Sequence, residues 1–377
     1  MNIPFHKPYI TEEDIACVAD SMRSGWLSTG PKTEEFEKRF KEYIFRGGGG
    51  GGYAVAVNSA TAALHLALKA VGVKAGDEII LPTNTFVATA EVATYFGVLP
   101  VLCDIEEKTH NIDASKIEPL ITSRTKALIP VHFGGQPCDM DEILAIAGKY
   151  NLSVIEDAAH SFPAGYKGKM IGTIGDITCF SFYATKTLCT GEGGMAVTSS
   201  GEYAGKIRIN RLHGIDRDAW ERDKMKENWL YDVVDNGCKY NMSDINGAMG
   251  LSQLSKVAWM HEERARVAGK YDEAFNGTRV VPLYMKPDRF SSRHLYVVKV
   301  NNRKEVMEEL KKMGIGTSVH FIPVHRFSYY RKAYGYRDED YPVANRVYEK
   351  SLSLPIYPGL TAGEIDYVAE AVLNHAE

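Results

Sequence analysis

The sequence predicts a two-domain α/β protein whose larger domain is built on a mainly parallel sheet of seven strands. With 377 residues, the chain is too long for one ordinary hydrophobic core. Short apolar segments alternate with helical ones over most of the first 250 residues, a pattern typical of a parallel sheet covered on both faces. Beyond that point the pattern changes to one long helix and mixed short elements. We therefore expect a large domain at 1–250 and a small α+β domain at 251–377.

Two helices are expected before the sheet. The first begins near Thr11, which is a good helix cap and is followed by three acidic residues. The second spans 33–44 and carries Phe36 and Phe40 on one face. The six glycines at 47–52 have no side chains to pack and a high ordering cost, so they predict a flexible surface loop.

The strands and the remaining helices follow from apolar runs and their periodicity. The seven predicted strands are 53–57, 78–81, 98–103, 125–131, 152–155, 177–182 and 195–198. Helices are expected between some of these strands, at 62–71, 87–96 and 140–150. In the small domain the expected elements are a connecting helix at 248–273, the segments 295–300, 304–313 and 317–322, and a final helix at 361–375.

The composition excludes several classes of function. With 45% hydrophobic and 24% charged residues and a net charge of -4, the chain resembles soluble globular proteins and lacks the positive charge of a nucleic-acid-binding protein. The six cysteines form no C-x-x-C pair, which indicates free thiols in a reducing compartment. The N-terminus lacks the apolar core of a signal peptide, and no apolar run is long enough to span a membrane. A cytoplasmic location without membrane partners is expected.

A candidate anion site follows the first predicted strand. Residues 58–64 read Asn-Ser-Ala-Thr-Ala-Ala-Leu and open a helix, where free backbone N–H groups and hydroxyls favour an anion. Plain helix capping also explains these residues. The segment lacks the glycine pattern of a P-loop, so an ATPase is not indicated.

Two acids and His160 follow the predicted strand at 152–155. An acid buried there needs a cationic partner, because an unpaired buried charge is costly. Strand alternation places Glu156 and Asp157 on opposite sides, so only one of them can face a given ligand. The pattern alone does not choose between them, and an ordinary ion pair or a metal ligand fits it too.

Lys186 comes just after the predicted strand at 177–182 and before the glycine-rich segment 191–194. A lysine at the end of a sheet can lose contact with water, which lowers its pKa and makes its amine a nucleophile. The glycines allow the backbone to approach a flat ligand closely. Taken alone, however, a lysine on a loop is usually a solvated charge.

The remaining candidates are aromatic or histidine side chains. Phe86 follows a strand and could either stack on a flat heterocycle or belong to the core. His320 and His325 lie five residues apart without a third metal ligand, so we expect contacts to a polar substrate and no metal site. The isolated histidines, which we expect to be structural or surface residues, are His132, His213, His261 and His294.

Together these motifs resemble the DegT/StrS aminotransferases, fold-type-I enzymes that use pyridoxal phosphate to act on nucleotide-linked keto sugars. The resemblance extends from residues 26–31 to 353–358. Its markers are Asn58–Ala62, Glu156–His160, Ser181–Lys186, Gly191–Gly194 and Tyr240–Asn246. Five ordered motifs at compatible spacings are not expected by chance. The glycine run at 47–52 departs from the family pattern.

The resemblance implies a role for each candidate residue. Lys186 would hold pyridoxal phosphate as a Schiff base and move protons, and Asp157 would pair with the ring nitrogen. Asn241 would reach the phosphate bound by a neighbouring subunit, which implies a homodimer with shared active sites. The other implied contacts are His160 near the ring hydroxyl or the acid, Phe86 on the ring face, Ala60, Thr61 and Ser181 on the phosphate, and Tyr183, His320 and His325 on the substrate.

The implied reaction moves an amino group from glutamate to a keto sugar. The segment 191–194 resembles that of relatives acting at C4 of a 4-keto-6-deoxy sugar, with a C3 ketone or a cyclitol ketone as alternatives. A catalytically silent regulator or a dehydratase of the same fold would have lost Lys186. A nicotinamide-dependent dehydrogenase needs its glycine motif after a strand, whereas the glycines at 47–52 precede one.

Overall fold

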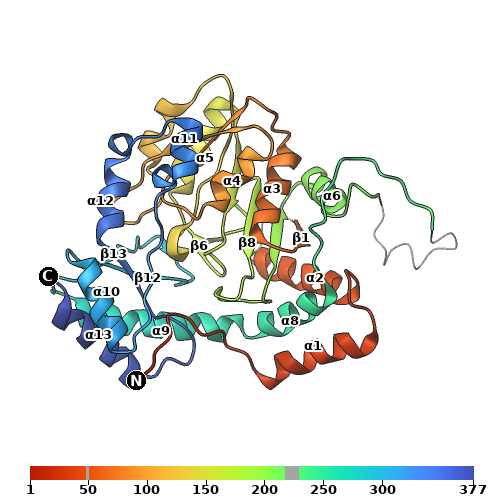
Figure 1. Cartoon of the computed structure of the whole chain (residues 1–377). Coiled ribbons are helices and arrows are strands. Elements are labelled where there is room, and N and C mark those ends of the chain that lie inside the picture. The colour runs from red at the N-terminus through yellow and green to blue at the C-terminus, as the bar shows by residue number, and fades with distance from the viewer. Residues whose placement is uncertain (48–50, 217–228) are drawn as a thin grey trace.

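The computed structural model describes residues 1–47, 51–216 and 229–377, and a seven-stranded sheet forms its centre (Figure 1). Residues 48–50 of the predicted glycine loop therefore lie outside the described residues. The strand order is β1-β9-β8-β5-β4-β2-β3. Strand β9 is antiparallel to both of its neighbours and the other adjacent pairs are parallel, so the predicted mainly parallel sheet is confirmed. The strands are β1 (Tyr53–Val57), β2 (Glu78–Pro82), β3 (Leu99–Cys103), β4 (Thr125–Leu128), β5 (Ser153–Asp157), β8 (Ile177–Ser181) and β9 (Gly194–Thr198).

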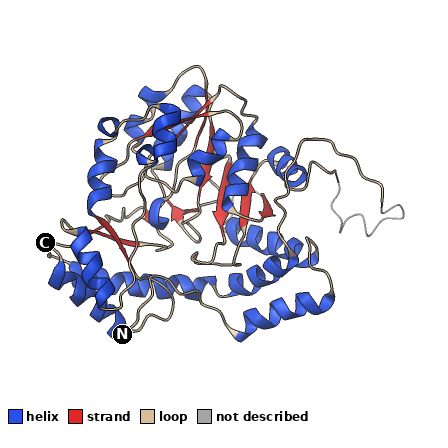
Figure 2. Cartoon of the chain, viewed as in Figure 1, coloured by secondary structure: helices blue, strands red, loops and turns tan. Residues whose placement is uncertain are grey.

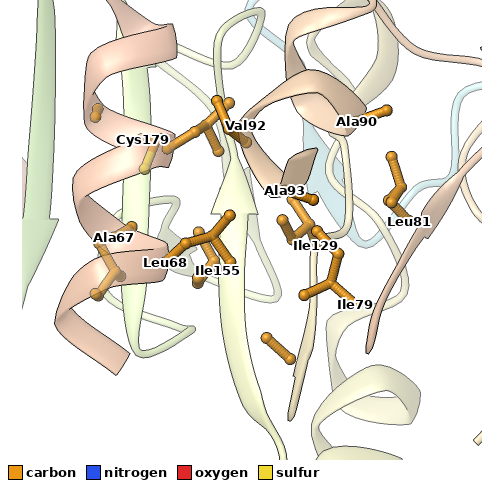
Figure 3. Packing of buried hydrophobic residues seen from close by; sticks show 14 of the residues in the cluster. Ala67, Leu68, Ile79, Leu81, Ala90, Val92, Ala93, Ile129, Ile155 and Cys179 are labelled. Atoms are coloured by element: carbon orange, nitrogen blue, oxygen red, sulfur yellow. The ribbon is translucent and has the colours of Figure 1, made fainter. Parts of the chain in front are cut away.

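Helices cover both faces of this sheet (Figure 2). Successive residues of a strand point to opposite faces, so β2 places Ile79 and Leu81 in one hydrophobic cluster and Ile80 in the other. Figure 3 shows Leu68 of α3 (Ala60–Val71) beside Ile155 of β5. Burial on both faces explains why these strands appear in the sequence as continuous apolar runs.

The described helices agree with most of the expected ones. They are α1 (Glu12–Ser24), α2 (Pro31–Phe45), α3, α4 (Ala88–Thr94), α5 (Met140–Tyr150), α6 (Gly201–Asn210), α8 (Asp244–Ser255), α9 (Val257–Phe275), α10 (Arg303–Lys312), α11 (Ser328–Tyr334), α12 (Pro342–Lys350) and α13 (Ala362–His375). The expected connecting helix is two helices, because α8 ends and α9 begins on either side of Lys256. In Figure 1 they run end to end beneath the large domain.

The small domain contains a three-stranded antiparallel sheet of β10 (Val281–Pro282), β12 (Tyr296–Lys299) and β13 (Ser351–Leu354). The expected segment 317–322 adds no strand to it, since only Ser318 pairs with Ser353. The reason is that the chain turns toward the large domain, where Phe321 N donates to the Asn84 side chain at 3.3 Å. A second small sheet joins β11 (Arg289–Phe290), β6 (Gly165–Tyr166) and β7 (Lys169–Met170).

Packing between the domains crosses the expected boundary at residue 250. Ile3 belongs to the small-domain cluster together with Leu310. Conversely, Val324 and Ala344 belong to the large-domain cluster that contains Ile155. Both termini lie beside the small-domain helices in Figure 1. The division at residue 250 thus remains a prediction, and the N-terminal segment is part of the small-domain packing.

Two negative findings concern the described part of the chain. None of its helices combines the length and apolar character needed to cross a membrane. Within the same residues, no group of three or more histidine, cysteine, aspartate or glutamate side chains is arranged to hold a metal ion. All six cysteines are free thiols.

Candidate active site

A cavity of about 630 Å³ lies between the sheet and the small domain, a size typical of small-molecule sites. Its floor is formed where strands β5 and β8 end, at Asp157 and Ser181. Most of the predicted site residues line it together: Ala60, Thr61, Phe86, Asp157, His160, Ser181, Tyr183, Lys186 and His320. The structure therefore gathers into one place motifs that are far apart in the sequence.

One end of the cavity offers hydrogen-bond donors to an anion. The Ser59 hydroxyl caps α3 by accepting from Ala62 N at 3.1 Å. The first helical N–H groups, those of Ala60 and Thr61, have no acceptor within the helix and lie at its positive end. The Ser181 hydroxyl accepts from Tyr183 N at 3.3 Å and keeps its own proton for a ligand. These donors fit the phosphate of pyridoxal phosphate.

Gly194 allows the chain to form this anion site. A Cβ atom at Gly194 would lie 2.4 Å from the carbonyl carbon of Ser59 and 2.7 Å from Ala60 N. Only glycine lets β9 approach the start of α3 so closely. The glycine-rich segment identified in the sequence thus serves close backbone packing, and Gly193 from the same segment borders the cavity.

Asp157 is a buried carboxylate in the cavity wall, with 5% of its surface exposed. Its Oδ2 accepts from the Thr89 hydroxyl at 2.7 Å and its Oδ1 accepts from Ala159 N at 3.1 Å. Among the described residues no cation lies within ion-pair distance of Asp157, and burial raises the pKa of its carboxyl group. A protonated ring nitrogen is the kind of partner that such a carboxylate lacks.

Glu156 faces the opposite side of β5. Its carboxylate accepts from the Thr178 hydroxyl at 2.7 Å and from Gly175 N at 2.8 Å, and it contacts the buried ring of His132 at 2.9 Å. These bonds hold the β5 end in place without reaching the cavity. From the sequence, strand alternation could not decide which of the two acids faces a ligand. In the structure only Asp157 faces the cavity.

Lys186 lies in a turn after β8, where its N–H donates to Tyr183 O at 2.8 Å. The pKa of the Lys186 amine is lowered to about 8, mainly because burial removes water from it. The Asp157 carboxylate opposes this decrease, and the Arg264 guanidinium adds to it. A substantial fraction of the amine is therefore neutral near physiological pH, which a nucleophile requires. This amine, Asp157 and the anion donors together fit the predicted cofactor.

His294 also lines the cavity, although no motif in the sequence indicates it. It was expected to be structural or superficial, yet its Nε2 lies 3.5 Å from Lys186 Nζ and its ring lies 4.4 Å from that of His160. His294 stands just before β12, so only the docking of the small domain brings it to Lys186. No spacing within the sequence signals such a contact.

Four imidazoles line the same cavity as the Lys186 amine, and burial lowers the pKa of each. The pKa values of His6 and His320 fall to about 4, and those of His160 and His294 lie well below the usual range. The positive charge that Lys186 carries when protonated lowers the pKa of all four rings further. The rings are therefore neutral at pH 7 and serve as hydrogen-bonding groups rather than cations.

Two predicted residues lie outside this cavity. His325 is buried with its Nδ1 2.7 Å from the Thr83 hydroxyl and its Nε2 3.1 Å from Asn345 Oδ1, so it does not line this cavity and its substrate contact stays a prediction. The cause is the bond from Val324 N to Thr83 O at 2.8 Å, which pins this turn against the end of β2. Asn241 donates to the Thr29 hydroxyl at 2.7 Å and lines a separate cavity of about 240 Å³.

Comparison with known proteins identifies the family of the chain. The model of the DegT/DnrJ/EryC1/StrS aminotransferase family matches residues 8–373. The spore coat polysaccharide biosynthesis protein SpsC of Bacillus subtilis is 47% identical, over 98% of this chain and 96% of that protein.

Solved structures give the same result. Spr1654 of Streptococcus pneumoniae, assigned as a sugar aminotransferase and solved in PLP, PMP and apo forms, superposes in its PMP form with a TM-score of 0.92 at 35% identity, over 99% of this chain and 98% of that one. PseC of Helicobacter pylori, an aminotransferase of pseudoaminic acid biosynthesis, gives a TM-score of 0.91 at 28% identity over 99% of both chains. This protein belongs to the DegT/DnrJ/EryC1/StrS family and is a pyridoxal-phosphate-dependent aminotransferase of fold type I.

Proposed function

We propose that the protein transfers the amino group of glutamate to a nucleotide-linked keto sugar, at C4 of a 4-keto-6-deoxy sugar. The observation that carries the chemistry is the placement of Lys186 and Asp157 in the wall of one cavity. The sugar class is supported by the family and by relatives named for sugar transamination and polysaccharide synthesis. The C4 position is supported by the resemblance of the segment 191–194 to that of relatives acting at C4, and a C3 ketone or a cyclitol ketone is the alternative.

In this proposal, Lys186, His294 and Asp157 have separate roles. When bound, pyridoxal phosphate supplies an aldehyde and an electron-accepting ring. The Lys186 amine takes the proton from the α-carbon of the amino acid and later delivers a proton to the carbon that receives nitrogen. His294 Nε2, at 3.5 Å, holds that amine in place. The Asp157 carboxylate would keep the ring nitrogen of the cofactor protonated.

A direct assay tests the proposed reaction. Purified protein supplied with pyridoxal phosphate and glutamate is expected to convert a 4-keto-6-deoxy nucleotide sugar, with nitrogen found at C4 by NMR. The visible absorption of the bound cofactor should fade when glutamate is added. Lys186→Ala is expected to show no turnover, because no other amine is positioned in this part of the structure, whereas Lys169→Ala on the exposed β7 should behave as wild type. Conversion of none of a panel of C4 and C3 keto sugars would refute the proposal.

The two neighbouring acids provide a matched pair of variants. Asp157→Asn is expected to lower kcat by about 100- to 1000-fold, because it removes the charge that faces the ring nitrogen. Glu156→Gln should lower the free energy of unfolding by about 1–3 kcal/mol while changing kcat less than about threefold. Urea unfolding and steady-state rates measure both effects. Equal losses of kcat in the two variants would contradict the assignment.

The pKa of Lys186 predicts a pH dependence. Only the neutral amine attacks an aldehyde, so the rate at which cofactor-free protein captures pyridoxal phosphate should rise with pH and level off above about 8. An ordinary lysine, with a pKa near 10.4, would continue to gain rate over about two further pH units. Stopped-flow absorbance measures the rate, and Nα-acetyl-lysine serves as the control for the titration of the cofactor itself. A protein profile that follows the control would contradict the lowered pKa.

The proposed homodimer can be tested by mixing two variants. Asn241 lies outside the Lys186 cavity of its own chain, so its proposed contact to the phosphate requires a second chain. Asn241→Ala alone should weaken cofactor binding, and Lys186→Ala alone should be inactive. After random mixing, half of the dimers are hybrids with one complete site, which predicts about a quarter of wild-type activity at limiting cofactor. Activity that merely averages the two separate variants would argue against shared sites.

A further inference from the structure

The N-terminal segment, residues 3–6, is attached to the small domain by backbone pairing. Ile3 is 1% exposed and forms a parallel bridge with Ile315. Ile3 N donates to Gly314 O at 2.8 Å, and Gly316 N donates to Ile3 O at 2.8 Å. This attachment fixes the position of the two residues that follow.

The small domain is shaped to receive this segment. A Cβ atom at Gly316 would lie 2.5 Å from Phe5 N and 3.1 Å from the carbonyl carbon of Pro4. Any side chain there would push the segment away. The close approach shows that the backbone of residues 4 and 5 lies against the small domain, although the Pro4 side chain is exposed and Phe5 is half-buried.

Phe5 and His6 form part of the cavity wall. The Phe5 ring stacks on the His320 ring with centroids 5.6 Å apart and an angle of 27° between the planes. His6 Nε2 lies 3.0 Å from Ala184 O, two residues before Lys186. The segment thus connects the small domain to the Lys186 turn and closes one side of the cavity.

The location of Phe5 separates it from the cofactor groups. The anion donors, Asp157 and Lys186 all come from the large domain. Phe5 and His320 come from the segment and loop that pack with the small domain, and Phe321 extends this wall with its ring 5.7 Å from that of His160. The His320 ring is neutral at pH 7, so it presents a flat and largely apolar face.

We propose that the stacked rings of Phe5 and His320 bind the sugar ring of the amino acceptor and make the N-terminal segment part of the acceptor site. The C–H face of a sugar packs well on aromatic rings, whereas glutamate has no comparable face. This inference rests on the proposed function, since it concerns the keto sugar of that reaction.

Phe5→Ala tests the inference, with Lys7→Ala, at the exposed residue that follows the segment, as a control. Removal of the ring is expected to raise the KM for the keto sugar by about tenfold, a typical effect of truncating a buried aromatic contact. Calorimetry should show a similar loss of affinity for the amino sugar product. The rate of amino-group uptake from glutamate, followed by absorbance in the absence of sugar, should change much less, and Phe5→Tyr should restore the KM.

The outcomes separate this inference from the proposed function. If wild-type protein converts no keto sugar, the proposed function fails and the inference fails with it. If wild-type protein is active and Phe5→Ala leaves the sugar KM unchanged, only the inference is wrong. If Phe5→Ala slows glutamate uptake as much as sugar conversion, Phe5 has a general structural role and the inference is again wrong.

Discussion

The site depends on one electrostatic constraint, a carboxylate buried without a cation. Asp157 lies in the cavity wall with two hydrogen-bond donors, and no described residue pairs with its charge. Folding has oriented this charge in advance, so a ligand that carries a proton opposite it gains an interaction that costs little reorganisation. Strand alternation makes this possible, because it assigns Glu156 to structural bonds and Asp157 to the ligand. The Lys186 amine in the same cavity, whose pKa is lowered to about 8, completes the chemical requirement.

The two domains contribute different parts of the site. The large domain supplies the rigid groups that hold a cofactor: the start of α3, the ends of β5 and β8, and the turn of Lys186. The small domain supplies His294, and the loop at 318–321 and the N-terminal segment add the remaining wall. This division suits a family in which one cofactor serves many acceptors, since the acceptor wall can change while the cofactor groups stay fixed.

Much of this arrangement follows from the sequence, and the exceptions share a physical cause. All seven strands are recognisable because strands buried on both faces are short apolar runs. Lys186 and the acid pair Glu156 and Asp157 stand out in motifs whose parts lie close together in the chain, whereas the choice of Asp157 comes only from the family resemblance. His294, Phe5 and His6 were missed because they reach the site only through docking of distant segments. The same docking withdraws the segment 317–322 from the small sheet and turns His325 toward Thr83. Local patterns cannot report interactions that depend on which surfaces meet.

The tight fit at Gly194 has a consequence for how this chain can change over evolutionary time. Its backbone pairs with Val57 on one side and Ser181 on the other, and it touches the residues that open α3. One added methyl group would disturb two strand pairings and the anion donors together. A substitution of Gly194 is therefore expected to weaken binding of the cofactor. Among relatives, loss of this glycine should mark lineages that have given up transamination.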